Sequence, residues 1–234
     1  MYFNHKSIQY NIKIALNSCF ICTILLLTSC DSQKEKPTLT TLFETSKGTQ
    51  TPQYKDVISF YKNLAQSYPT ISITQEGQTD SGYPLHIIYF NPSGKSITAI
   101  LQAKKSTKNI LLINNGIHPG ESDGIDACML LLRDLAQGTI EAPTNTVIAV
   151  IPVYNIGGAL QRNSTSRTNQ EGPKAYGFRG NARNYDLNRD FIKADTKNAK
   201  AFTKIFRALD PELFIDNHVS NGADYQYTLT HLFT

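Results

Sequence analysis

The chain lacks three features that would narrow its class at once: a long apolar run, a strong excess of one charge and an internal repeat. No run of about 18 or more residues is free of polar interruption, which argues against an ordinary transmembrane helix. The formal net charge is +4 among 234 residues. This excess is too small for a surface dedicated to nucleic acid, which needs a clustered basic face. With 40% hydrophobic and 18% charged residues, the composition is that of a globular protein.

Cysteine is also scarce, and its distribution excludes a disulfide framework. Of the 4 cysteines, Cys19 and Cys22 lie in an apolar segment that we expect to be removed, and Cys30 stands directly after it. Cys128 is then the one thiol of the folded domain, so no disulfide framework can form there. It lies in the apolar run 128–132, and we expect it to be a buried, unreactive thiol.

Residues 1–29 have the form of an export signal. Two lysines precede an apolar stretch at 14–27, and small residues then lead into Cys30. This ending resembles a bacterial lipobox, which implies that Cys30 is the first mature residue and carries lipid on its thiol and amine. We expect residues 30–50 to be a polar tether and residues 51–234 to be the folded domain. The protein would then be exported and held at the bacterial cell envelope by its lipid; a plain signal peptide or a short anchor is the alternative.

Hydrophobic patterning predicts both helices and strands in the domain. Apolar residues at helical spacing predict helices at 54–68, 122–136 and 199–209. Short apolar runs separated by turn residues predict antiparallel strands at 71–75, 85–90 and 97–102. Continuous apolar runs, typical of strands buried on both faces, follow at 110–113 and 147–151, with a shorter strand at 213–217. The alternation predicts an α/β fold of three layers, α/β/α, around a mixed and mainly buried sheet that is incomplete at its C-terminal end.

Residues 156–190 are polar and rich in Gly, Asn and Arg, and we interpret them as a long functional loop. Its arginines are Arg162, Arg167, Arg179, Arg183 and Arg189. One interpretation is a solvated or nucleic-acid-binding surface. The other is a carboxylate-binding loop, because a guanidinium group can grip a carboxylate through two hydrogen bonds.

The tetrapeptide His118-Pro-Gly-Glu121 stands between a predicted buried strand and a predicted helix. A His and a Glu across a tight Pro-Gly turn can aim at one point, and their nitrogen and oxygen suit zinc at about 2.0–2.2 Å. The pair also fits a turn residue followed by a helix N-terminal carboxylate. His218, at the end of the strand 213–217, offers a third ligand, which leaves one position open as in catalytic zinc sites.

Together these motifs resemble the zinc carboxypeptidase family, the carboxypeptidase A-like metallopeptidases. The resemblance covers roughly residues 54–228, and its motifs stand in the family's order: His118-Pro-Gly-Glu121, Arg167-Thr-Asn, Asp186-Leu-Asn188-Arg189-Asp-Phe191 and Asp216-Asn-His218. It implies a carboxypeptidase-like fold, one zinc ion per chain and hydrolysis of peptide bonds near a free C-terminal carboxylate.

The resemblance also implies the metal-binding roles. His118, Glu121 and His218 correspond to the three zinc ligands of the family. Asp186 corresponds to the carboxylate that accepts a hydrogen bond from the first zinc histidine and thereby fixes the tautomer of its ring.

For the substrate, the resemblance implies that Arg167 polarises the scissile carbonyl and stabilises the oxyanion. Asn188 and Arg189 correspond to the pair that holds the C-terminal carboxylate. The family often has Asn-Pro-Asp-Gly before the arginine loop, where this chain has Asn-Ile-Gly-Gly beginning at Asn155. Because that turn differs, Arg162 stays an alternative to Arg167.

One expected residue is missing. The family's general base is a glutamate well downstream of the last zinc ligand, yet no glutamate and no counterpart of the family's substrate-covering tyrosine stands among the sixteen residues after His218. Glu141, Glu171 and Glu212 lie in loop or pre-strand positions without a motif. We therefore expect a C-terminally truncated metallocarboxypeptidase that is inactive alone.

Two other functions fit part of the pattern. A zinc-dependent N-acyl amino acid deacylase shares an H-x-x-E and a later His, and a non-catalytic module would bind zinc and a carboxylate without turnover. The export signal and the fuller loop match favour the peptidase. We expect a peptide or a peptidoglycan stem as substrate, membrane attachment through the lipid alone and no nucleic-acid partner. His86 and His231 are assigned no role.

Overall fold

The computed structural model describes residues 39–94, 98, 109–220 and 222–233. The predicted signal 1–29, the lipidation site Cys30 and nearly all of the predicted strand 97–102 lie outside these residues, so these three stay predictions. Along the described part, no helix is both long and apolar enough to cross a membrane.

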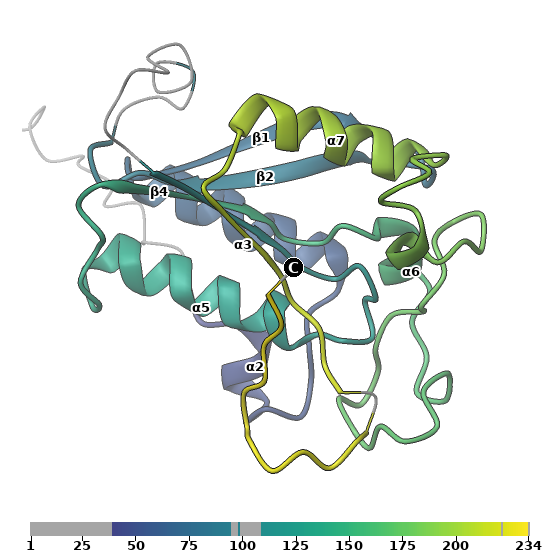
Figure 1. The fold of residues 1–234 in the computed structure, drawn as a ribbon. Helices are drawn as coiled ribbons and strands as arrows, with labels where there is room; N and C mark the ends of the chain where they lie inside the picture. The colour runs from purple at the N-terminus through teal and green to yellow at the C-terminus, as the bar shows by residue number, and fades with distance from the viewer. Residues whose placement is uncertain (1–38, 95–97, 99–108, 221, 234) are drawn as a thin grey trace, which may run out of the picture. The chain divides into compact units, whose positions relative to one another are not determined.

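In the described part of the chain, five strands form one mixed sheet in the order β1-β2-β4-β3-β5 (Figure 1). Their bounds are β1 Ile71–Gln78, β2 Pro84–Phe90, β3 Asn109–Asn114, β4 Thr146–Ile151 and β5 Leu213–Asp216. β1 and β2 form an antiparallel hairpin, and β2 also runs antiparallel to β4. β3 is parallel to both β4 and β5. The carboxyl ends of β3, β4 and β5 therefore meet at one edge of the sheet.

Helices cover both faces of this sheet (Figure 1). The helices are α2 Leu42–Thr45, α3 Tyr54–Ser67, α5 Asp123–Gln137, α6 Ile156–Leu160 and α7 Lys197–Leu209, with a 3-10 turn, η1, at Leu187–Arg189. Alternate strand residues face opposite layers: Ile88 packs with α3 and α5, whereas Ile87 packs with α7. This arrangement confirms the predicted three-layer α/β fold with a mixed sheet.

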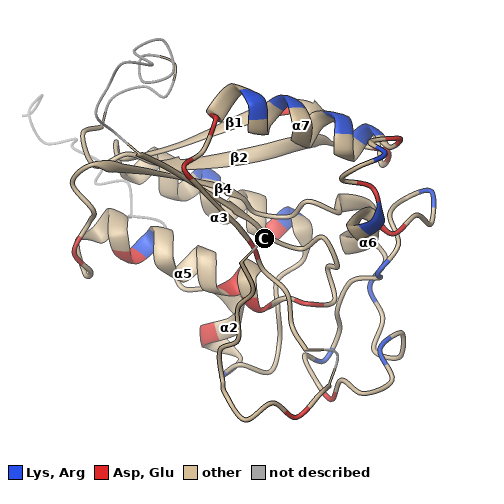
Figure 2. Ribbon diagram, viewed as in Figure 1, with Lys and Arg blue, Asp and Glu red and all other residues tan. Residues whose placement is uncertain are grey.

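Helix α7 shows how the sequence builds the outer layer. Thr196 caps its N-terminus by accepting a hydrogen bond from the amide of Ala199 at 3.0 Å. Phe202 and Ile205 lie on its buried face, in the core between α7 and the sheet. Its exposed face is basic (Figure 2), carrying Lys197, Lys200, Lys204 and Arg207. The apolar spacing alone therefore fixes which side packs inward.

Two segments expected to be irregular contain short helices. In the predicted tether, Thr41 and Glu44 form the capping box of α2, and Glu44 pairs with Arg133 of α5 at 2.7 Å. Residues 39–50 are thus folded against the domain, which corrects the tether assignment for that part. The loop 156–190 begins with α6 and contains η1. Helices this short fall below the window over which hydrophobic periodicity can be read.

Two residues that were assigned no chemistry are structural. Cys128 is a free thiol buried in α5, and burial raises its pKa to about 11, so it is unreactive as expected. His86 is buried in β2, with Nδ1 3.1 Å from the hydroxyl of Tyr54 and Nε2 3.3 Å from the amide of Gln75. Burial lowers the pKa of His86.

Candidate metal centre

The centre is built where the parallel strands β3 and β5 end. Asn114 at the end of β3 donates to Asp216 at the end of β5, with 2.9 Å between Nδ2 and Oδ1. The next pair repeats the link, because the amide of Asn217 donates to Oδ1 of Asn115 at 2.8 Å. Gly124 of α5 packs directly against this pair: a Cβ there would lie 2.5 Å from Oδ1 of Asn115. The strand ends and α5 are therefore held in close contact around the site.

The tight turn after β3 brings His118 and Glu121 together. The backbone amide of Glu121 donates to the carbonyl of His118 at 2.9 Å, and Nδ1 of His118 lies 3.0 Å from Oε1 of Glu121. Both side chains are buried. Gly120 keeps this turn free of crowding, because a Cβ at that position would lie 2.7 Å from Cδ of Arg167 and 3.0 Å from the backbone carbonyl oxygen of Gly177. The turn thus aims both side chains inward and leaves room for the arginine loop.

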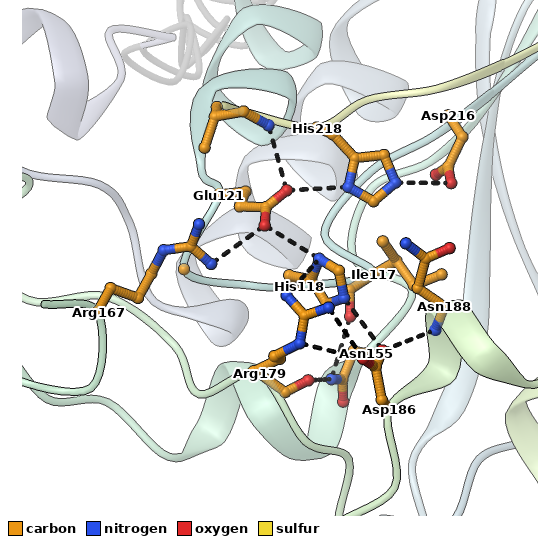
Figure 3. Close-up of polar contacts among 12 residues, drawn as sticks. Ile117, His118, Glu121, Asn155, Arg167, Arg179, Asp186, Asn188, Asp216 and His218 are labelled. Carbon is orange, nitrogen blue, oxygen red and sulfur yellow. Dashed lines mark hydrogen bonds and ion pairs between the residues drawn. The ribbon is translucent and has the colours of Figure 1, made fainter. Parts of the chain in front are cut away.

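The end of β5 brings His218 to the other oxygen of the same carboxylate (Figure 3). Nδ1 of His218 lies 2.9 Å from Oε2 of Glu121, and the amide of Val219 donates to that oxygen at 3.2 Å. One potential ligand atom each from His118, Glu121 and His218 lies within 4.8 Å of the others. Two imidazole nitrogens and a carboxylate oxygen at one point form the donor set of a catalytic zinc site with an open position.

An outer carboxylate holds each imidazole. Nε2 of His118 lies 3.1 Å from Oδ1 of Asp186, and Nε2 of His218 lies 3.0 Å from Oδ2 of Asp216. A carboxylate at Nε2 keeps the proton there, which leaves Nδ1 of each ring to face the common point. The predicted partner Asp186 is therefore in place, and Asp216 is its counterpart for the second histidine.

The charges at the centre are strongly coupled. Burial alone would raise the pKa of Glu121, but hydrogen bonds from His118 and His218 outweigh burial and hold that pKa well below its usual range. Hydrogen bonds to Asp216 and Glu121 raise the pKa of His218 to about 9. Burial also acts to raise the pKa of Asp186, and hydrogen bonds from His118 and Arg179 lower it overall. The centre is thus arranged to keep its carboxylates ionised around a positive charge.

The two candidate arginines point to different places. Nη1 of Arg167 donates to Oε1 of Glu121 at 3.1 Å, so its guanidinium lies beside the three ligand residues. Arg162 instead binds backbone carbonyls, those of Pro52 at 3.1 Å and Thr51 at 3.0 Å, together with that of Ala175. The structure therefore places Arg167 at the centre and gives Arg162 a structural role.

The predicted carboxylate clamp lies on η1. The backbone amide of Asn188 donates to Oδ1 of Asp186 at 3.0 Å, which ties the start of the clamp to the partner of His118. Arg189 is exposed, and its Nη1 donates to the carbonyl of Asn188 at 3.0 Å. Arg189 thus follows Asp186 by three residues in the sequence, and its guanidinium points toward the backbone carbonyl of Asn188.

Residues that the sequence reasoning missed hold the loop in place. Asn155 caps α6 by accepting from the amide of Gly158 at 2.9 Å, and its Nδ2 donates to the carbonyls of Ile117 and Arg179. Asn is one of the residues preferred at such an N-cap. Arg179 itself binds Asp186, at 3.1 Å from Nε and 2.9 Å from Nη2 to Oδ2. Nothing in the sequence separated Arg179 from the other arginines of the loop.

The carboxylates at the centre are all engaged. Glu121 faces both imidazoles, and Asp186 and Asp216 each face one. In the residues that the structure describes, no further carboxylate contacts His118, Glu121 or His218. Glu212, for example, accepts from the backbone amide of Ile110 at 2.6 Å, where β5 pairs with β3.

The mixed sheet and the cluster of His118, Glu121 and His218 at its carboxyl edge agree with the family resemblance seen in the sequence. A family model described as zinc carboxypeptidase matches residues 57–213, and the chain belongs to that family. The family consists of zinc-dependent hydrolases, and the centre of His118, Glu121 and His218 is where such a metal fits.

Individual relatives agree with the family. Carboxypeptidase 2 of Trichophyton rubrum is 25% identical over 178 residues, which cover 74% of this chain and 30% of the relative. A metallo-carboxypeptidase from Burkholderia cenocepacia has a similar fold, with a TM-score of 0.56 and 19% identity over 74% of this chain and 43% of that one. Bovine thrombin-activatable fibrinolysis inhibitor, solved with tick carboxypeptidase inhibitor, gives a TM-score of 0.55, with 17% identity over 74% of this chain and 62% of that chain. The chain spans less than half the length of the first two.

Proposed function

We propose that the chain carries the metal centre of a zinc-dependent carboxypeptidase, which cleaves peptide bonds next to a free C-terminal carboxylate. The observation that supports this most is the convergence of His118, Glu121 and His218 within 4.8 Å, with a carboxylate behind each imidazole. One zinc ion per chain fits this donor set. When bound, zinc polarises a carbonyl oxygen and activates water for attack.

The protein's own groups would bind and orient the peptide. Arg167 lies against Glu121, where its guanidinium can stabilise negative charge that develops on a carbonyl oxygen next to the centre. Asn188 and Arg189 would hold the terminal carboxylate, which requires Arg189 to leave the carbonyl of Asn188. A charge-assisted contact of this kind is worth about 1.5–3 kcal/mol.

Proton transfer is the part that the described residues do not supply. Each of the three carboxylates at the centre already holds an imidazole, so none is placed to act as a general base. We therefore propose that this chain binds zinc and a peptide but turns over slowly, since a positioned base typically contributes about 10²–10⁴-fold. That same observation favours a second candidate, a module that binds zinc and carboxylates without turnover.

A binding experiment tests the carboxylate clamp without requiring turnover. N-acetyl-Ala-Phe and its C-terminal amide are titrated into the zinc-loaded chain by calorimetry. We expect the free acid to bind about tenfold more tightly or better, and Arg189→Ala to abolish the difference. Arg207→Ala, on the exposed face of α7, is the control and should keep the preference. Equal affinity for acid and amide in the unmodified chain would contradict the clamp.

Turnover separates the two candidates. Release of phenylalanine from N-acetyl-Ala-Phe is measured with the zinc-loaded chain and, if the reading frame continues past Thr234, with the longer protein. Slow release by this chain and fast release by the longer protein support the peptidase. Release by neither favours the binding module.

For the location, we propose lipid attachment at Cys30 and residence in the bacterial cell envelope, with a peptide or a peptidoglycan stem as substrate. The leader sequence and the lipobox-like ending support this. Cys30→Ser should move the protein from the membrane fraction to the soluble fraction, whereas Cys128→Ser should not. Membrane retention of Cys30→Ser would count against it.

A further inference from the structure

Beside the metal centre lies a polar cavity of about 240 Å³, formed by the arginine loop. Its lining residues are Ser166, Arg167, Thr168, Asn169, Gln170 and Arg179. All six side chains are polar, two are guanidinium groups, and no carboxylate is among them. A cavity of this composition suits an anionic ligand.

Arg179 divides its donors between the protein and this cavity. Nε and Nη2 are used on Oδ2 of Asp186, at 3.1 and 2.9 Å. Nη1 lies 3.4 Å from Nδ1 of His118, which is too long for a strong hydrogen bond. Nδ1 of His118 also faces the metal position, so a bound metal ion would prevent it from accepting a hydrogen bond from Arg179. The side chain of Arg179 is 40% exposed and therefore accessible to a ligand.

The charge at the loaded centre calls for an anion. Two guanidinium groups and three carboxylates surround the ligand atoms: Arg167, Arg179, Glu121, Asp186 and Asp216. Metal-bound imidazoles are neutral, so a divalent cation leaves the group with an excess of one positive charge. A carboxylate placed near Nη1 of Arg179 would balance that charge inside a partly desolvated cavity, where charge-assisted hydrogen bonds are strongest.

The cavity does not include the proposed clamp for the terminal carboxylate, although Arg179 and the backbone amide of Asn188 bind the same carboxylate, that of Asp186. Arg167 and Arg179 line it, whereas Asn188 and Arg189 do not. Figure 3 shows Arg167 and Asn188 on opposite sides of His118. If Asn188 and Arg189 hold the residue that is released, the cavity faces the residue on the acyl side of the scissile bond.

We propose that Arg179 binds a carboxylate on the acyl side of the substrate, so that the site selects peptides whose penultimate residue is acidic. The inference rests on the proposed function, because it uses the direction in which a peptide with a free C-terminus would lie. Arg179 then has two tasks: it orients Asp186 behind His118, and it contacts the substrate through Nη1.

The test compares two peptides of the same shape, N-acetyl-Glu-Phe and N-acetyl-Gln-Phe, titrated into the zinc-loaded chain. Both carry the terminal carboxylate, so the ratio of their dissociation constants isolates the acyl-side charge. We expect the Glu peptide to bind about tenfold more tightly. Arg179→Gln should bring the ratio close to one. Arg183→Gln changes an arginine of the same loop that stacks on Tyr185 and lines no part of the cavity, and it should keep the ratio.

A second variant distinguishes a lost contact with the substrate from a loss of the metal centre. Arg179→Lys retains the positive charge, and the zinc content of every variant is measured alongside binding. Equal affinity of the unmodified chain for the two peptides would overturn the inference. So would a preference that survives in both Arg179 variants at full zinc content. If the unmodified chain binds neither zinc nor either peptide, the proposed function fails rather than this inference.

Discussion

Asp126 is an acid placed where its charge is costly. It lies buried in α5, and its Oδ1 is without a hydrogen-bond partner among the described residues. Burial raises its pKa from 3.8 to about 6, although a hydrogen bond from Thr51 acts in the opposite direction. Folding therefore favours the protonated form of Asp126 relative to the unfolded chain.

This preference sets a pH dependence. Because the folded pKa is the higher one, the contribution of Asp126 to stability is fully present below about pH 4 and is lost as pH rises through 6. We expect Asp126→Asn to raise the free energy of unfolding at pH 8 by about 1–3 kcal/mol and to change it little at pH 4. Urea denaturation at the two pH values measures this. Asp224→Asn, on an exposed segment, is the control and should shift stability by less than about 0.5 kcal/mol. An equal effect of Asp126→Asn at both pH values would contradict the assignment.

At the same scale, the sequence located the candidate metal ligands but not all of the residues that support them. His118, Glu121 and His218 were identified because their residue types and order match one family motif, and the turn and the strand end leave little freedom in where they point. Arg179 was one of five arginines in a long polar loop. Its contact with Asp186 depends on the backbone conformation of that loop. Asn155 fixes this conformation through hydrogen bonds to backbone carbonyls. The amino-acid composition of the loop does not predict these hydrogen bonds.

Among the elements, the parallel pair β3 and β5 does most to position the centre. Their register sets Asn114 opposite Asp216, and each strand continues directly into one imidazole ligand. Long elements such as α3, α5 and α7 were predictable from their apolar spacing, within one or two residues. α2 and α6 were not predictable in this way, since four or five residues are too few to show a hydrophobic period. Capping residues such as Thr41 and Asn155 define these helices instead.

Asp216 links the end of β5 to metal affinity. Its Oδ2 accepts from Nε2 of His218 at 3.0 Å, and its Oδ1 accepts from Asn114. Asp216→Asn keeps the shape but removes the charge that keeps the proton on Nε2. We expect zinc affinity to fall by about 10–100-fold, measured by competition with a chromophoric chelator. Asp224→Asn, on an exposed segment, should leave the affinity unchanged. An unchanged affinity in Asp216→Asn would show that Asp216 does not support His218.

For the whole molecule, the described sheet ends at β5, and that edge carries apolar side chains. Leu213 is 51% exposed and Ile215 is 37% exposed, and the strand pairs with β3 on one side. An apolar sheet edge is a template for association with another chain.

We expect Leu213→Lys to reduce self-association, because a charge on an edge strand opposes edge-to-edge pairing. Light scattering of the purified chain at increasing concentration measures the effect. Ile192→Lys is the matched control, since Ile192 is 98% exposed but lies outside the sheet. The control should behave like the unmodified chain. If both variants reduced scattering equally, general surface charge rather than the sheet edge would be the cause.

The central claim is that His118, Glu121 and His218 form one metal centre. Elemental analysis of the purified chain after zinc loading and removal of free metal tests it most directly. We predict about one zinc per chain, and a loss of that zinc in the double variant His118→Ala, Glu121→Ala, with a folded circular dichroism spectrum as the control. Full zinc occupancy in the double variant would contradict the claim.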